Sequence, residues 1–158
     1  MNTQLTHRVV NYSTKETAAA MRKALKAAWP GVKFSVTMSR GTGHGWLHVN
    51  YVDGPLESEV RGLCYGFQSS QFSGMDDSYH SVDSTLYAEP DGSLVEYRFS
   101  CCGVNTSRDY SPEAEAWAKS VAVRGSHWWP DGLDAYLDNE YFSTRGLLAG
   151  TDLTAGFP

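Results

Sequence analysis

The sequence predicts one α+β domain in which two β-hairpins form a four-stranded antiparallel sheet, with helices packed on one face. Three observations lead to this fold class. Helical and strand-like hydrophobic periodicities follow one another in the order α-β-β-α-β-β-α-α. Turn-forming residues separate the two strands of each hairpin. The chain of 158 residues is long enough to bury a core, and its 41% hydrophobic and 20% charged residues exclude wholesale disorder.

The first predicted helix begins after Ser13, which forms a capping box with Glu16 three residues later. The apolar residues after the cap recur at helical spacing, which indicates one buried face. They are Ala18, Met21, Leu25 and Ala28. The run Trp29-Pro30-Gly31 ends the helix.

Two strands of alternating apolar and polar residues predict the first hairpin. The inward-facing positions are Val32, Phe34, Val36 and Met38 on the first strand and Leu47, Val49 and Tyr51 on the second. The glycine-rich run from Arg40 to Gly45 joins them. It precedes a strand and not a helix, so it lacks the helix N-terminus that phosphate-binding loops use and is interpreted as a hairpin connection.

A second helix is predicted after the turn Asp53-Gly54-Pro55. Its core-facing stripe is Leu56, Val60, Leu63, Cys64 and Phe67. Residues 68–77 are mostly polar and contain glycine, which predicts a loop.

The second hairpin is predicted for residues 82–88 and 94–101, which flank the turn Glu89-Pro90-Asp91-Gly92. Its core-facing residues are Val95, Tyr97, Phe99 and Cys101. A third helix begins at Ser111-Pro112-Glu113 and presents Ala114, Trp117, Ala118 and Val121. A short fourth helix is expected to contain Leu133, Tyr136, Leu137 and Tyr141.

Charge and cysteine content restrict the function classes. Residues 1–40 have a net charge of +6, residues 41–108 of −6 and residues 109–158 of −5. An acidic chain is not typical of a general nucleic-acid binder, although one basic face remains. The N-terminus lacks the apolar segment of a signal peptide, and no apolar run reaches the length of a membrane helix. Three cysteines, two of them adjacent, form no disulfide framework, so we expect a cytoplasmic protein.

No catalytic signature, cofactor-binding motif or metal-ligand spacing is found, so we expect a non-enzymatic protein without metal or cofactor. One alternative is a thiol–imidazole pair. It would join one of the histidines His44, His48 and His80 to Cys101 or Cys102. The run Asp76-Asp77 with Tyr79-His80 is equally compatible with an active site and with an ordinary loop.

A basic stripe on the first predicted helix is the candidate contact for an anion or a nucleic acid. It consists of Lys15, Arg22 and Lys26 on the face opposite the apolar residues, with Lys23 beside them. The alternative is a solvated helix face without a partner.

A Trp-rich acidic segment near the C-terminus is the candidate contact for a protein partner, because tryptophan is enriched at interaction hot spots. The residues concerned are Trp128, Trp129, Asp131, Asp134 and Asp138. The alternative is that the two tryptophans clasp the last helix to the sheet.

Four runs of sequence resemble the twenty-ninth of the large polyvalent protein associated domains. They are Arg22 to Val36, Asp53-Gly54-Pro55 with Glu59-Val60, Phe72 to Asp76, and Arg108 to Pro112. The resemblance implies a domain over residues 12–111, followed by a C-terminal helical extension over residues 112–158. It also implies a context, since these domains occur in giant proteins of phages and conjugative elements whose cargo is suspected of countering host defence.

The function expected from the sequence is that of a small binding protein of a mobile genetic element, which acts in the host cytoplasm by occupying a host factor. Charge separation between the basic first helix and the acidic C-terminal third would speed association with a complementary partner. The first alternative is a nucleic-acid-binding accessory protein that uses the basic helix with Trp46 or His48 of the hairpin. The second alternative is an enzyme of unrecognised type.

Overall fold

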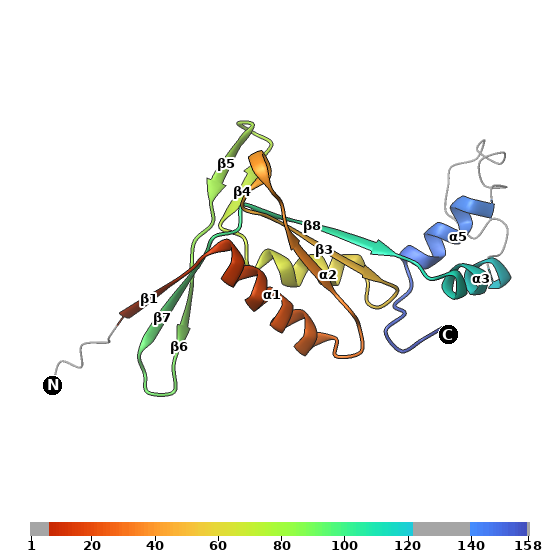
Figure 1. Cartoon of the computed structure of the whole chain (residues 1–158), viewed down its shortest axis with the longest axis horizontal. Coiled ribbons are helices and arrows are strands. Elements are labelled where there is room, and N and C mark those ends of the chain that lie inside the picture. The colour runs from red at the N-terminus through yellow and green to blue at the C-terminus, as the bar shows by residue number, and fades with distance from the viewer. Residues whose placement is uncertain (1–6, 122–139, 158) are drawn as a thin grey trace.

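The computed structural model describes residues 7–121 and 140–157 and has a mixed α+β architecture (Figure 1). The elements along the chain are β1 (His7–Tyr12), α1 (Thr14–Ala28), β2 (Ser35–Met38), the 3-10 turn η1 (Gly41–Gly43), β3 (Trp46–Val52), α2 (Glu57–Tyr65), β4 (Ser70–Ser73), β5 (Ser78–Ser81), β6 (Thr85–Ala88), β7 (Leu94–Phe99), β8 (Gly103–Asp109), α3 (Pro112–Val121) and α5 (Glu140–Ala149).

The strands form three small sheets, so the predicted single four-stranded antiparallel sheet and its element order are wrong. The sheets have the orders β1-β7-β6, β2-β3-β8 and β4-β5. Both predicted hairpins, β2–β3 and β6–β7, exist and are antiparallel. They lie in different sheets because each is completed by a parallel strand from elsewhere in the chain, β8 beside β3 and β1 beside β7. Parallel partners leave no hairpin signal in the sequence.

Helix α1 forms as the sequence predicts. The Ser13 backbone N–H donates to Glu16 Oε2 at 2.8 Å, and the Glu16 N–H donates to Ser13 Oγ at 3.4 Å, which completes the capping box. Ala18, Met21 and Leu25 are buried as expected. Ala28 is exposed, contrary to the prediction, and Thr17 takes a place on the buried face.

The main core lies between one face of the β2-β3-β8 sheet and the helices α1 and α2. Leu47, Val49 and Tyr51 of β3 are fully or almost fully buried there. They contact Met21 and Leu25 of α1 and Val60 and Cys64 of α2 within the same cluster. Because side chains alternate along a strand, Trp46, His48 and Asn50 lie on the opposite face of the sheet.

The strands β1, β4, β5 and β8 were not predicted from the sequence. Residues 70–77, predicted as a loop, and residues 78–81 together form the β4–β5 hairpin. Strand β8 escapes the hydrophobic pattern because its inward positions are Val104, Thr106 and Arg108, of which only the first is apolar. Strand β1 is mostly exposed and lacks apolar alternation. In the first hairpin, Val32 and Phe34 precede β2, and Met38 is exposed.

A second, smaller core joins α3 to α5 at the end of the molecule away from β1 and β6 (Figure 1). Its buried residues are Ala114, Ala118, Leu148 and Leu153, which include two of the four positions predicted for the third helix. The fourth predicted helix lies mostly outside the described residues. None of the helices in the described ranges combines the length and apolar character that a membrane span requires.

Candidate functional site

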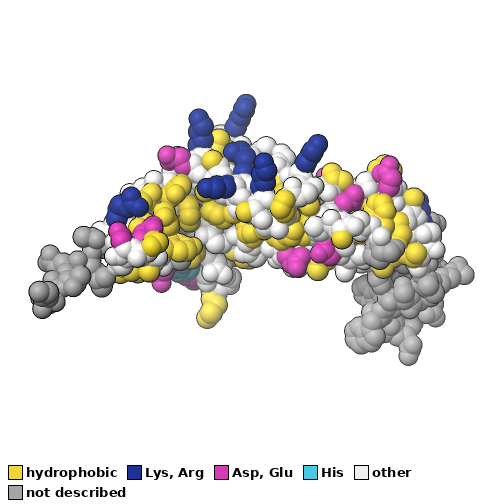
Figure 2. All heavy atoms as spheres, turned by 90° about the horizontal axis from the view of Figure 1, so that it is seen from below, with side chains coloured by type: hydrophobic (Ala, Val, Ile, Leu, Met, Phe, Trp, Pro, Cys, Tyr) yellow, Lys and Arg dark blue, Asp and Glu magenta, His cyan; other side chains and the backbone are white. Residues whose placement is uncertain are grey.

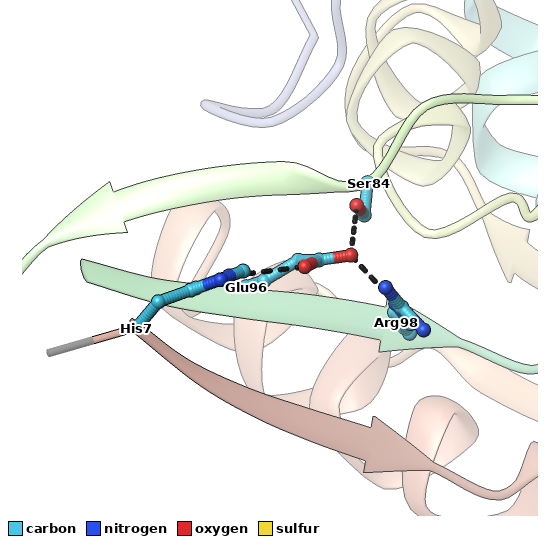
Figure 3. Close-up of polar contacts among 4 residues, drawn as sticks. All are labelled: His7, Ser84, Glu96 and Arg98. Carbon is cyan, nitrogen blue, oxygen red and sulfur yellow. Dashed lines mark hydrogen bonds and ion pairs between the residues drawn. The ribbon is translucent and has the colours of Figure 1, made fainter.

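A buried carboxylate, Glu96 of β7, gathers polar side chains from three segments (Figure 3). Arg98 Nε donates to Glu96 Oε1 at 2.6 Å, and Ser84 Oγ donates to the same oxygen at 2.5 Å. His7 Nε2 of β1 lies 3.0 Å from Glu96 Oε2. Ser84, Glu96 and Arg98 also line a cavity of about 320 Å³.

The surroundings of Glu96 favour its ionised form. The hydrogen bond from Arg98 and then that from Ser84 lower the pKa of Glu96 to about 2, against the opposing effect of burial. A carboxylate with so low a pKa is a weak general base at neutral pH. The arrangement therefore indicates a structural role, in which the ionised Glu96 carboxylate holds β1, β7 and the start of β6 together.

An aromatic pocket of about 360 Å³ lies between the β4–β5 hairpin and the first residues of β3 and β8. We define the aromatic pocket by its lining residues Trp46, Tyr65, Gln68, Ser70, Gln71, Phe72, Tyr79, Val82, Cys102, Gly103 and Val104. The Tyr79 ring contacts the Trp46 ring edge-on, with centroids 6.4 Å apart, and the Phe72 ring at 5.3 Å. The volume is within the range of ligand sites.

Two features of the chain hold the aromatic pocket in place. The Trp46 ring lies against Gly103, where an added Cβ would be 2.5 Å from Trp46 Cζ3, so any larger residue would displace the ring. The hairpin is tied at its base because Ser69 Oγ and Ser70 Oγ donate to the carbonyls of Cys101 and Cys102, each at 2.8 Å. The sequence predicted an exposed role for Trp46 and placed Tyr79 in a polar run that could be an active site or a loop, but it did not predict that Phe72 and Tyr79 form a pocket with Trp46. The sequence signal that could have predicted this hairpin is the turn Gly74 to Asp77, which the aromatic residues Phe72 and Tyr79 flank.

The basic stripe of Lys15, Arg22, Lys23 and Lys26 is exposed on α1. Figure 2 shows Lys and Arg side chains gathered over the middle of the face on which α1 lies. Arg22 differs from the three lysines because its guanidinium donates to the Val36 carbonyl of β2 at 2.5 Å and so ties the helix to the sheet.

The basic stripe and the hairpin residues Trp46 and His48 do not form one surface. Helix α1 packs on the sheet face of Leu47 and Val49, whereas Trp46 and His48 lie on the other face. The expectation that the basic stripe and Trp46 or His48 contact one nucleic acid through a single surface is therefore wrong.

Two of the three candidate histidines, His48 and His80, have partners other than thiols. His48 Nε2 lies 2.6 Å from Ser39 Oγ, and His80 Nε2 lies 2.6 Å from Asp76 Oδ2, while His44 is exposed. Burial raises the pKa of Cys101 to about 11, which suppresses the thiolate. Cys102 is exposed and lines the aromatic pocket. In the described ranges no group of three or more potential metal ligands gathers.

A buried arginine, Arg108 of β8, donates hydrogen bonds to the backbone carbonyls of four residues, and its guanidinium lies 5.1 Å from the centre of the Tyr110 ring. Its Nε donates to Asp53 at 3.1 Å, and its terminal nitrogens donate to Gly54 at 2.9 Å, Leu148 at 3.2 Å and Thr151 at 2.7 Å. These bonds join the β3–α2 turn to the C-terminal end of α5, where a cation complements the helix dipole. Arg108 was not predicted as a site residue.

The candidate protein-binding residues Trp128, Trp129, Asp131, Asp134 and Asp138 lie outside the described residues. Their role stays a prediction from the sequence.

Comparison with known proteins identifies the family. Residues 12–111 match the family described as Large polyvalent protein associated domain 29. The chain belongs to this family. No curated protein and no solved structure gives a significant match.

Three of the four runs that resemble the large polyvalent protein associated domain meet in space. A cavity of about 570 Å³ is lined by Val32 and Lys33 of the first run, Asp53 and Gly54 of the second, and Asp109 of the last. The Asp53 and Gly54 backbones have φ of +56° and +69°, which turns their carbonyls toward Arg108. These contacts give the three runs a structural role in the fold of the domain. The run Phe72 to Asp76 lies apart, on the β4–β5 hairpin.

Proposed function

We propose that the protein is a non-enzymatic binding protein of a phage or other mobile genetic element, which acts in the host cytoplasm by occupying a host factor, such as a defence component. Membership of the large polyvalent protein associated domain family is consistent with this origin. The observation that supports binding best is the apolar surface of the β4–β5 hairpin.

The hairpin exposes large apolar side chains that the core does not use. Phe72 is 50% exposed, Tyr79 56% and Met75, at the turn, 99%. Aromatic residues and methionine are enriched at the centres of protein interfaces, and a clustered exposed apolar patch is typical of an interaction site.

The state of the titratable side chains also supports a binding role. Glu96 is held as a carboxylate by Arg98 and Ser84. Burial raises the pKa of Cys64 to about 12 and that of Cys101 to about 11, so neither thiol is a ready nucleophile.

Affinity capture from host lysate with quantitative mass spectrometry tests the proposal. The immobilised protein is expected to retain a host protein in stoichiometric amount, and the variant Phe72→Ser/Met75→Ser is expected to lose it. The control Leu86→Ser/Tyr87→Ser removes exposed apolar side chains of β6, away from the hairpin. If both variants capture the host protein as well as the wild type does, the hairpin is not the binding surface.

A nucleic-acid-binding accessory protein is the second candidate, favoured by the basic stripe of α1. The variant Lys15→Glu/Lys23→Glu/Lys26→Glu reverses the three lysines and keeps Arg22, whose bond to Val36 supports the fold. Binding to duplex DNA should fall steeply with salt and be lost in this variant, with an unchanged melting temperature. Lys119→Glu on α3 is the control. A wild-type protein without salt-dependent DNA binding excludes this candidate.

The Trp-rich acidic segment is proposed as an additional protein contact. Replacement Trp129→Ala separates the two interpretations. Lost capture with an unchanged melting temperature supports a contact surface, and a truncated hot-spot tryptophan typically costs about 2 kcal/mol or more of binding free energy. A lowered melting temperature with capture retained by the folded fraction indicates a clasp within the domain.

A further inference from the structure

We infer that the aromatic pocket binds a cationic side chain, an arginine or a lysine, from a basic segment of a protein partner. The inference rests on the proposed function, because it names the chemical class of the partner that the hairpin contacts. Three features of the pocket support it: the arrangement of its rings, the charge around it and its hydrogen-bond acceptors.

The rings that line the pocket are set at wide angles to one another. The planes of Trp46 and Tyr79 are perpendicular, at 90°, and Phe72 is inclined to Tyr79 by 59°. Tyr65, which is 54% exposed, also lines the pocket. A cation over the face of an aromatic ring is attracted by the ring quadrupole, and rings set at angles allow more than one such contact at once.

The charge near the pocket favours a cation over a phosphate. The residues that line the pocket include no aspartate, glutamate, lysine, arginine or histidine. The carboxylates of the hairpin are Asp76 and Asp77, both exposed at its turn, and Asp76 Oδ2 lies 2.6 Å from His80 Nε2 of β5. Hydrogen bonds, first from Ser73, lower the pKa of Asp76, so this carboxylate stays ionised in mildly acidic solution. Such a field repels the backbone of a nucleic acid and attracts a basic peptide.

Acceptors for the N–H groups of a cation lie in the same pocket. Ser70 Oγ donates its proton to the Cys102 carbonyl, which leaves the oxygen lone pairs free to accept. The side-chain carbonyls of Gln68 and Gln71 are further acceptors among the lining residues. A guanidinium group, with five N–H donors in a planar fork, matches this combination of ring faces and neutral oxygens.

Two capped tripeptides test the inference on the whole chain. Gly-Arg-Gly supplies the cation, and Gly-citrulline-Gly supplies a neutral group of nearly the same shape. Two-dimensional NMR follows the indole N–H signal of Trp46, assigned with the variant Trp46→Phe. Gly-Arg-Gly is expected to shift this signal in a saturable manner at millimolar concentration, and to bind about tenfold more tightly than the citrulline peptide.

Substitutions in the pocket sharpen the test. Tyr79→Leu removes a ring face and should weaken Gly-Arg-Gly binding about tenfold. Tyr79→Phe keeps the ring face and should bind the peptide with the affinity of the wild type. Asp77 has φ of +53°, which asparagine tolerates, so Asp77→Asn removes one charge without straining the turn and should weaken binding as well. Tyr87→Leu on β6 is the matched control and should bind like the wild type.

Equal affinity for the arginine and citrulline peptides overturns the inference, as does the absence of a saturable shift. A single-stranded oligonucleotide that shifts the Trp46 signal when Gly-Arg-Gly does not would assign the pocket to nucleobases instead. If a host protein is captured as well by Tyr79→Leu as by the wild type, the proposed function stands and the cation pocket falls.

Discussion

Glu96 is buried, and its hydrogen bonds make the stability of the β1-β7-β6 sheet dependent on pH. Its pKa falls from an ordinary 4.5 to about 2 in the folded protein. A lowered folded-state pKa means that the ionised carboxylate contributes stability fully above about pH 4.5, and that this contribution is lost as the pH falls toward 2.

We therefore expect Glu96→Gln to have a lower melting temperature than the wild type at pH 7 and a shallower decline between pH 4.5 and 2. Thermal denaturation followed by circular dichroism across this pH range measures both. The exposed Glu113→Gln on α3 serves as the control and should keep the wild-type slope. A Glu96→Gln slope equal to that of the wild type would contradict the assigned role.

The three cysteines should differ in reactivity. Cys64 and Cys101 are buried and burial raises the pKa of each, whereas Cys102 is exposed. Brief treatment of the native protein with iodoacetamide at pH 8 is expected to alkylate Cys102 alone, and treatment in denaturant to alkylate all three. Peptide mass spectrometry reads the sites directly. Native labelling of Cys64 at a comparable rate would show that α2 opens readily.

At the scale of single elements, two glycines give opposite predictions. Gly62 lies in α2 with open space around an added Cβ, so Gly62→Ala should stabilise the protein by about 0.5–1 kcal/mol. Gly103 lies in β8 against the Trp46 ring, so Gly103→Ala should destabilise it by about 1–3 kcal/mol and displace the ring. Urea denaturation gives both values. A neutral Gly103→Ala would mean that Trp46 is not fixed in the pocket.

Elements with a local signal could be predicted from the sequence. The capping box of α1, the buried stripe of α2, and the hairpins β2–β3 and β6–β7 are all specified by neighbours within a few residues. Strand β8 could not be predicted, because Arg108 occupies an inward position that looks exposed in any hydrophobic pattern. Its side chain is satisfied by carbonyls from distant residues, which no local pattern reveals.

The candidate site was predictable to a smaller extent. The lysines of α1 are exposed as the helical spacing indicates. The aromatic pocket depends on a hairpin interpreted as a loop, since its strands are short and mostly exposed and their polar residues hide the alternation. That α1 and Trp46 occupy opposite faces of one sheet results from packing, which the order of elements along the chain does not specify.

At the scale of the whole molecule, Arg108 connects the matched domain to the residues beyond it. We expect Arg108→Met to lose roughly 2–4 kcal/mol of unfolding free energy, because several buried carbonyls would be left without a donor. Arg61→Met is the control, since the exposed Arg61–Glu57 pair on α2 should contribute less than about 1 kcal/mol. Urea denaturation compares the two. Equal losses of unfolding free energy in the two variants would contradict the proposal that Arg108 connects the two parts of the chain.

The two parallel pairings have a consequence for how the chain folds as it is synthesised. Strand β1 cannot pair until Leu94–Phe99 has left the ribosome, and β3 cannot complete its ladder until Gly103–Asp109 has emerged as well. Contacts between residues so far apart in sequence slow folding. Until β8 emerges, Trp46–Val52 has one open edge beside the apolar Leu47 and Val49, and this unpaired edge is where a nascent chain would be vulnerable to aggregation.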